Sequence, residues 1–310
     1  LRLLRREGDN IDEDSEIEYA TAGYVTGPHT LFQEVFALQS GGCVSWRPGG
    51  AAPEIHRYYE YSCSYDADSS VETLSEEFGQ VLLSAFGRLV DDLNDRQVVV
   101  PLSSGLDSRL VAATLKRLKY DNVLCVSYGV PANTEASRSR AVAEALGHRW
   151  EQVPYSRRLW HEALRSKAMM GYWSFSANGV SVPHCDDWLA LQALRDHGKV
   201  QEGAVFIPGH TGDFISGSHL KYVFDPTWHE DPYDLATAIV KKHYSVWGHL
   251  VAMPGVRRII ERRIHETLDT FPRESHEDLA RMYEFWEWQE RQAKLIINSV
   301  RSYEFFGFSW

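Results

Sequence analysis

The sequence has few cysteines, no long apolar run and a deficit of positive charge. Its four cysteines lie far apart and form no CxxC pair, which argues against structural zinc and a disulfide framework. We expect a reducing, cytoplasmic location, and buried structural roles for Cys43 and Cys63. No stretch approaches the roughly 20 apolar residues that span a bilayer, and no secretory leader is present, so we expect no membrane association.

Basic residues are outnumbered, with 32 Lys and Arg against 43 Asp and Glu and a net charge of -11. This balance argues against a nucleic-acid partner, because such binding needs basic groups to neutralise phosphates. The 13 histidines show no HExxH spacing, so zinc is not expected either. The 310 residues suffice for more than one domain. The sequence starts with Leu1 rather than Met and stops at Trp310 in the middle of an aromatic run. We therefore expect it to be part of a longer polypeptide.

Hydrophobic periodicity predicts alternating strands and helices after residue 68. A capping box at Ser69 and Glu72 begins a predicted helix that extends to residue 93. Strands are expected at 98–102, 123–127, 150–153 and 204–207, with helices at 108–119, 134–146 and 187–196. This alternation predicts a doubly wound parallel α/β sheet. Residues 1–16 look like a mobile or surface segment, and residues 43–46 look like a strand. Residues 225–303 look mostly helical, and we expect the aromatic side chains there to lie in a core rather than to form a ligand platform.

The most informative stretch is VVVPLSSGLDSR, residues 98–109, in which a buried strand leads through small and hydroxyl residues into a helix. Such a loop suits a phosphate, because backbone N–H groups and the positive helix end face the ligand. Asp107 within the loop implies Mg²⁺ between the carboxylate and the phosphates. Walker A is excluded by the absence of Gly-Lys-Ser/Thr. An ordinary capped turn is the alternative interpretation, and Arg109 either reaches phosphate or lies on the surface.

The loop resembles the SGG-x-DS pyrophosphate loop of N-type ATP pyrophosphatases, with Ser104 in place of the first Gly. Two further segments are similar to the glutamine-hydrolysing asparagine synthetase family. One is Ser127-Tyr128-Gly129 followed by a helix that ends Leu146-Gly147, and the other is the Gly209-to-Gly217 loop. Residues 18–59 are similar to the end of the family's glutaminase domain, and 298–306 loosely to a later segment. The resemblance implies an adenine nucleotide alpha hydrolase-like, three-layer fold. It divides the chain into a β-rich glutaminase-like remnant, 1–62, and a synthetase domain with a helical C-terminal part, 63–310.

By this resemblance the chain is a carbon–nitrogen ligase. ATP would activate a small-molecule carboxylate as an acyl-adenylate, with release of pyrophosphate, and ammonia would displace AMP. Asp107 and Asp213 would be catalytic metal ligands for Mg²⁺. ATP would contact a set of residues at the strand ends: Leu102, Ser103, Ser104, Gly105, Leu106, Asp107, Ser108, Ser127, Gly129 and Gly209. A homodimer is compatible with the family, although the sequence does not specify the oligomeric state.

The departures from the family pattern are also informative. His210 stands at a usually acidic position and is either a catalytic base or a loop histidine. Phe214 replaces a Glu, and Asp213 itself is either a metal ligand or a turn residue. The glutaminase's amino-terminal cysteine is missing, so no glutamine hydrolysis is expected, and Lys294 does not match the family's catalytic lysine. Three alternatives remain: a different acid (a sugar uronic acid, a peptide or an internal ring closure), a nucleotide-binding relative without catalysis, and a transfer-RNA-modifying enzyme, which the charge disfavours.

Overall fold

The computed structural model describes residues 10–50, 52–64, 68–131, 133–221 and 234–310. The chain forms two compact units, each assembled from separate stretches of sequence. The first unit comprises residues 1–65, 177–183 and 213–298, and the second comprises 66–176, 184–212 and 299–310. The division expected at residue 62 concerns the ancestry of the amino-terminal segment and stays a prediction.

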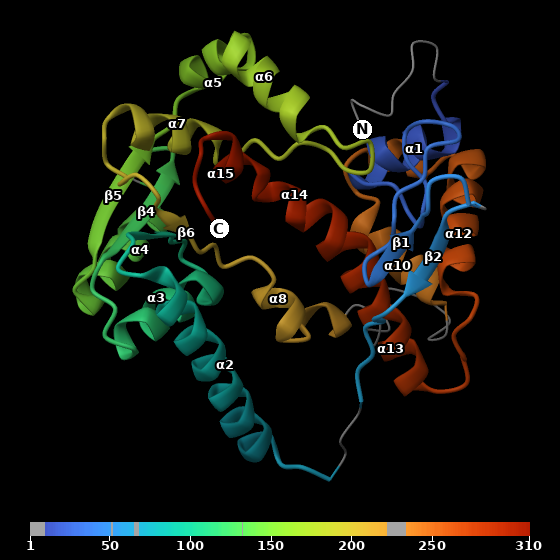
Figure 1. Cartoon of the computed structure of the whole chain (residues 1–310), viewed down its shortest axis with the longest axis horizontal. Helices are drawn as coiled ribbons and strands as arrows, with labels where there is room; N and C mark the ends of the chain where they lie inside the picture. Colours follow the sequence, from blue (N-terminus) through green and yellow to red (C-terminus); the bar gives the residue numbers. More distant parts are fainter. Residues whose placement is uncertain (1–9, 51, 65–67, 132, 222–233) are drawn as a thin grey trace. The chain divides into compact units, whose positions relative to one another are not determined.

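The second unit contains a four-stranded, fully parallel sheet in the order β5-β4-β3-β6 (Figure 1). Its strands are β3 (Val98–Pro101), β4 (Val123–Gly129), β5 (Arg149–Pro154) and β6 (Val205–Phe206). Each lies within two residues of its predicted position. The β-branched run of β3 is buried on both faces, as expected for the centre of a parallel sheet.

Helices cover both faces of this sheet, so the predicted three-layer α/β fold is confirmed (Figure 1). Val98 and Val100 pack on one face against α2 (Val71–Leu93), α3 (Leu106–Arg117) and α4 (Thr134–Leu146). Val99 points to the opposite face, because side chains alternate along a strand. That face packs against α5 (Arg157–Leu164), α6 (Lys167–Ser176), α7 (Trp188–Asp196) and α15 (Arg301–Phe305).

The order in which strands are added to the sheet changes side at β3. β4 and β5 extend from one side of it, whereas β6 pairs with its other side. In doubly wound sheets a crevice opens at such a switch point, outside the carboxyl ends of the two strands. The loops after β3 and β6, residues 102–105 and 207–211, lie at this edge. The topology thus brings together two of the three segments that the sequence singled out.

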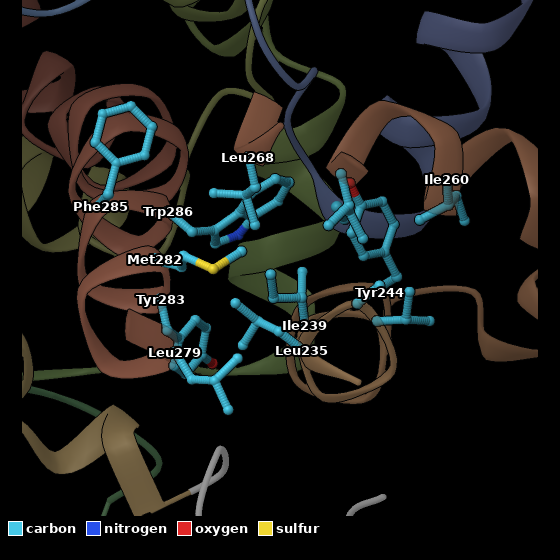
Figure 2. Packing of buried hydrophobic residues seen from close by; sticks show 14 of the residues in the cluster. Leu235, Ile239, Tyr244, Ile260, Leu268, Leu279, Met282, Tyr283, Phe285 and Trp286 are labelled. Carbon is cyan, nitrogen blue, oxygen red and sulfur yellow. The ribbon is translucent and has the colours of Figure 1, made fainter. Parts of the chain in front are cut away.

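The first unit is mainly helical and has its own hydrophobic core (Figure 2). Leu235, Ile239, Ile260, Met282 and Trp286 pack together there. They come from the helices α10 (Leu235–His243), α12 (Pro254–Leu268) and α13 (His276–Trp286), to which α1 (Glu13–Ala22) and α11 (Gly248–Val251) add. The predicted helical character and the predicted core role of Phe285 and Trp286 are confirmed. Residues 225–233 lie outside the described residues.

Smaller elements complete the described chain. A hairpin of β1 (Gly42–Ser45) and β2 (Glu54–Arg57) includes most of the strand predicted at 43–46. The turns α8 (Gly212–Ile215) and η1 (Ser218–Leu220) follow β6. After α13 the helix continues as the π-helix η2 (Glu287–Ile296) and α14 (Ile297–Ser299). Of the helices in the described ranges, none is both long and apolar enough to cross a membrane.

Three local predictions differ from the structure. Of the segment expected to be mobile or on the surface, residues 1–9 lie outside the described residues. Residues 13–16 begin α1, because the Asp12 carboxylate accepts a hydrogen bond from Ser15 N at 2.8 Å and caps the helix, while Glu13 and Glu16 are exposed. The cap of α2 is Ser70, to which Thr73 N donates at 3.2 Å; either of two adjacent serines offers the required hydroxyl. Cys43 is exposed, because it lies on the solvent-facing hairpin.

Lys294 is buried within the first unit, where its ammonium group makes three hydrogen bonds. Its buried Nζ donates to Val25 O at 2.8 Å, to Gly27 O at 2.7 Å and to Glu290 Oε2 at 2.5 Å. Lys294→Met should therefore strand a buried carboxylate and lower the free energy of unfolding by about 3–5 kcal/mol. Chemical denaturation of the variant measures this loss. The control is Arg281→Met, which breaks an exposed i,i+4 pair worth about 0.5 kcal/mol. Equal stability of the two variants would contradict the prediction.

Candidate functional site

Hydroxyl groups shape the loop that leaves β3. Leu102 is buried and still paired to β4, since its N–H donates to Val126 O at 2.8 Å. After it, Ser103 N donates to Ser108 Oγ at 3.0 Å and Gly105 N donates to Ser103 Oγ at 3.0 Å. The chain is thereby curled tightly between strand and helix. Leu106 begins α3 and exposes its side chain to solvent. Any contact of Leu106 with the predicted ligand would therefore be made by its backbone.

The start of α3 has the properties of an anion site. Its N-cap is Gly105, which has no side chain to occupy the N–H groups of the first turn. Ser104 N donates to the Glu135 carboxylate at 3.4 Å, so the loop already holds one anionic group in this structure. Arg109 folds back and donates from Nη2 to Ser104 O at 2.6 Å and from Nε to Gly105 O at 3.0 Å. Arg109 thus supports the loop from its carbonyl side.

The loop after β6 packs directly on this helix start. A Cβ added to Gly209 would lie 2.6 Å from Ser108 N and 2.9 Å from Ser108 Cα, which is closer than real contacts allow. A Cβ added to Gly212 would lie 2.3 Å from Asp107 Cγ. Both positions therefore require glycine. Between them, Thr211 has a φ of 73°, a strained conformation for a β-branched residue. The close approach fixes the loop after β6 against the start of α3.

Ser127 and Gly129 end β4 beside the loop. The buried Ser127 Oγ donates to Leu102 O at 2.8 Å and lies 2.5 Å from Ser139 Oγ. Its hydroxyl therefore ties the two strand ends together, and a contact of Ser127 with nucleotide stays a prediction. Gly129 has a φ of 129°, which favours glycine, and its carbonyl accepts from Tyr155 N at 2.7 Å.

His210 lies in the loop after β6, and its Nδ1 is 3.0 Å from Ser299 Oγ. The side chain retains solvent exposure, yet neighbouring atoms desolvate the imidazolium and lower the pKa of His210 below 6.5. The nearby His184 lowers the pKa further, whereas the Asp187 carboxylate opposes the shift. At neutral pH the ring is consequently uncharged and able to accept a proton.

Sequence reasoning missed a polar cluster around Asp187, which is buried at the start of α7. Its carboxylate accepts hydrogen bonds from Tyr128 Oη and, at 2.7 Å, from Tyr303 Oη. Burial and the adjacent carboxylate raise the pKa of both tyrosines, so they remain donors. The only sequence signal was Asp187 before a predicted helix, which is equally typical of an N-cap.

Asp213 and Phe214 follow Gly212 in the chain and belong to the first unit. Asp213 is exposed, and its carbonyl accepts from Ser218 Oγ at 3.0 Å. Phe214 is buried, stacked on His219 with ring centroids 5.5 Å apart and tilted against Tyr61 at 5.3 Å. Phe214, which stands where the family pattern has Glu, therefore packs against aromatic rings. The pairing of Asp213 with Asp107 stays a prediction.

A family model described as "Asparagine synthase" matches residues 80–304, which is most of the chain. None of the curated proteins matches. Among solved structures, an NH3-dependent NAD synthetase from Campylobacter jejuni, in complex with the nitrate ion, is similar to this chain at 12% identity and a TM-score of 0.32. That match covers 64% of this chain and 98% of the other.

Proposed function

The chain belongs to the asparagine synthase family of ATP-dependent amidating ligases, and we propose that it joins ammonia to a carboxylate while ATP is cleaved to AMP and pyrophosphate. The observation that carries the proposal is the loop at 102–108. It lies at the switch point between β3 and β6, has an uncapped helix start, and is packed against Gly209 without room for a side chain.

In this proposal the residues of the loop bind the pyrophosphate part of ATP. The N–H groups of Leu106, Asp107 and Ser108 at the positive end of α3 would face the phosphate oxygens. Ser103 and Ser108 hold the loop in its curled shape through their mutual hydrogen bonds. Glu135, which now accepts from Ser104 N, would give way to phosphate. The main contribution of the chain would be to hold ATP in one reactive orientation.

Asp107 fits a magnesium ligand. Its carboxylate is a hard oxygen donor that is fixed against Gly212 at the carboxyl edge of the sheet, which is where the phosphates would lie. Asp213 is the next residue after Gly212 and would supply a second carboxylate. Bound magnesium would neutralise phosphate charge during the reaction. The chemical reason for including a cation is that a carboxylate and phosphate oxygens repel each other unless a cation lies between them.

The proposed sequence of steps is the following. An oxygen of the substrate carboxylate attacks the α-phosphorus, and pyrophosphate leaves. Ammonia then attacks the acyl carbon, and AMP leaves with the bonding electrons of the acyl–oxygen bond. Neutral His210, oriented by Ser299, would take the proton released by the attacking nitrogen. Aspartate is the first acid to test, and a sugar uronic acid, a peptide carboxylate and an internal amine that closes a ring are the others.

A second candidate function is nucleotide binding without catalysis. The observation in its favour is Phe214, which is buried among aromatic rings at a position where the family pattern has an acidic residue. A screen of carboxylic acids with ATP, Mg²⁺ and ammonia separates the two functions. AMP released in stoichiometry with an amide supports the ligase. ATP binding without AMP release from any acid supports the non-catalytic function instead.

The pH dependence of the reaction tests the role of His210. Because the pKa of His210 is lowered from 6.5, the base form persists to lower pH, and kcat/KM should fall only below pH 6.5. His210→Gln should lower the rate by about 10²–10⁴-fold and remove this acidic limb. The control is His197→Gln at the exposed end of α7. If kcat/KM of His210→Gln still falls below pH 6.5, another group is responsible for that fall.

A further inference from the structure

Asp187 is a buried carboxylate in the second unit to which the proposed reaction assigns no role. It stands at the N-cap position of α7, yet within the described chain its side chain does not cap that helix. Instead, its Oδ1 accepts a hydrogen bond from Tyr128 Oη, and its Oδ2 accepts one from Tyr303 Oη at 2.7 Å. The ordinary role of Asp at a helix start therefore does not account for this residue, and burial of its charge costs free energy.

One helical turn connects Asp187 with the proposed base His210. At the end of α14, Ser299 Oγ lies 3.0 Å from His210 Nδ1, and Tyr303 in α15 donates to Asp187. Val300, which joins the two helices, is itself in the right-handed helical region, with φ −82° and ψ −7°. Residues four positions apart on a helix lie on the same side, with Cβ atoms roughly 5–6 Å apart. This turn therefore holds the imidazole and the carboxylate next to each other.

The charges around His210 agree with this placement. Desolvation has the largest effect and lowers the pKa of His210, the Asp187 carboxylate raises it, and His184 lowers it. Asp187 at the start of α7 and His184 in the segment before it are, among the described residues, the charged groups that act on this ring. Asp187 thus favours the imidazolium, which is the form that His210 takes after it has accepted a proton.

We propose that Asp187 is a positioning residue for proton transfer at His210, whose protonated form it stabilises; this role rests on the amidation proposed above. In the tautomer whose Nδ1–H donates to Ser299 Oγ, Nε2 has the free electron pair. As ammonia bonds to the acyl carbon, one of its protons passes to Nε2, and the electrons of the broken N–H bond stay on nitrogen. The Asp187 carboxylate then compensates the charge of the imidazolium.

The alternative is a purely structural role, in which Asp187 joins β4 to α15 through its two phenol partners. Both roles predict that loss of the carboxylate destabilises the protein, so stability alone does not separate them. Only the positioning role predicts that the titration of His210 changes with the charge at residue 187. The titration can be followed without ATP, acid or ammonia.

NMR titration of protein labelled in histidine provides this test, with the His210 signal assigned by its loss in His210→Gln. In Asp187→Asn the midpoint should move to lower pH, and the protonated fraction of His210 at pH 6 should fall by at least about threefold. His184→Gln should move the midpoint to higher pH, because it removes a group that opposes protonation. The control is Asp196→Asn, at the exposed end of α7, which should leave the midpoint in place. Should Asp187→Asn fail to fold, Asp187→Ser removes the same charge and decides.

The rate of amide formation supplies the second measurement. Asp187→Asn should lower kcat by at least about 10-fold, since general acid–base catalysis supplies about 10²–10⁴-fold in total, and should move the fall of kcat/KM to lower pH. Asp187→Glu, which keeps the charge, should restore part of the rate and a midpoint closer to that of the parent. A His210 midpoint unchanged in folded Asp187→Asn or Asp187→Ser would overturn the role of Asp187 alone. A parent protein that forms no amide from any acid would instead contradict the amidation, and with it this proton transfer.

Discussion

Asp107→Asn should lower pyrophosphate release from ATP by about 100-fold or more. The substitution keeps the shape that packs against Gly212 but removes the charge that would hold magnesium. Loss of one group that stabilises transferring phosphate commonly costs about 10²–10³ in rate. The measurement is pyrophosphate release under saturating ATP, with thermal unfolding recorded in parallel to show that the variant is folded.

The matched control for this variant is Asp121→Asn. Asp121 is exposed after α3 and pairs with Lys116 at 3.4 Å, so its loss should leave the rate within about twofold. An Asp107→Asn protein that releases pyrophosphate at the parent rate would remove Asp107 from the site. A parallel Asp213→Asn variant tests the pairing: if both carboxylates hold one ion, the double variant should lose less than the sum of the single losses.

Gly209→Ala should lower the same rate by about 100-fold, although it changes no charge. The added Cβ would meet the backbone of Ser108 at 2.6 Å, and a backbone atom cannot rotate away. Restoring ordinary contact requires a displacement of about 1 Å between the two loops, and such a misplacement of binding groups costs on the order of 10²-fold. Steady-state pyrophosphate release and ATP affinity would both be measured.

Gly87→Ala provides the control for this steric argument. Gly87 lies within α2 in the same unit, and apart from its chain neighbours and the backbone of its own helix no atom lies within 4 Å of the position of its added Cβ. Alanine at this helical site should stabilise the protein by roughly 0.5–1 kcal/mol and leave activity unchanged. If Gly209→Ala were as active as Gly87→Ala, the contact between the β6 loop and α3 would have no part in catalysis.

The sheet and its loop were predictable because their signals are local. The run at 98–100 has the composition of a buried strand, and the small residues at 103–105 precede a helix with an amphipathic pattern. The helix at 134–146 was placed correctly at both ends, since Asn133 caps it and Gly147 ends it in the left-handed region. Propensity, patterning and caps agree at these positions.

The features that were missed depend on contacts between distant parts of the sequence. Residues 177–183 join the first unit because Val25 N and Val182 N exchange backbone hydrogen bonds with Val180 O and Gly23 O, which no local pattern shows. The Asp187 cluster needs Tyr303 from the last helix. In α2 the periodicity predicted the helix, yet Leu74, Phe78 and Val81 along its apolar stripe are exposed. Periodicity identifies an element but not what covers it.

Calorimetric titration of the protein with ATP and with AMP, each in the presence and absence of Mg²⁺, tests the central claim most directly. If the loop at 102–108 holds the pyrophosphate part of ATP, ATP should bind at least 10-fold more tightly than AMP, and the difference should require Mg²⁺ and disappear in Asp107→Asn. Equal affinity for ATP and AMP, or an ATP affinity unaffected by Mg²⁺ and by Asp107→Asn, would contradict the assignment of this loop.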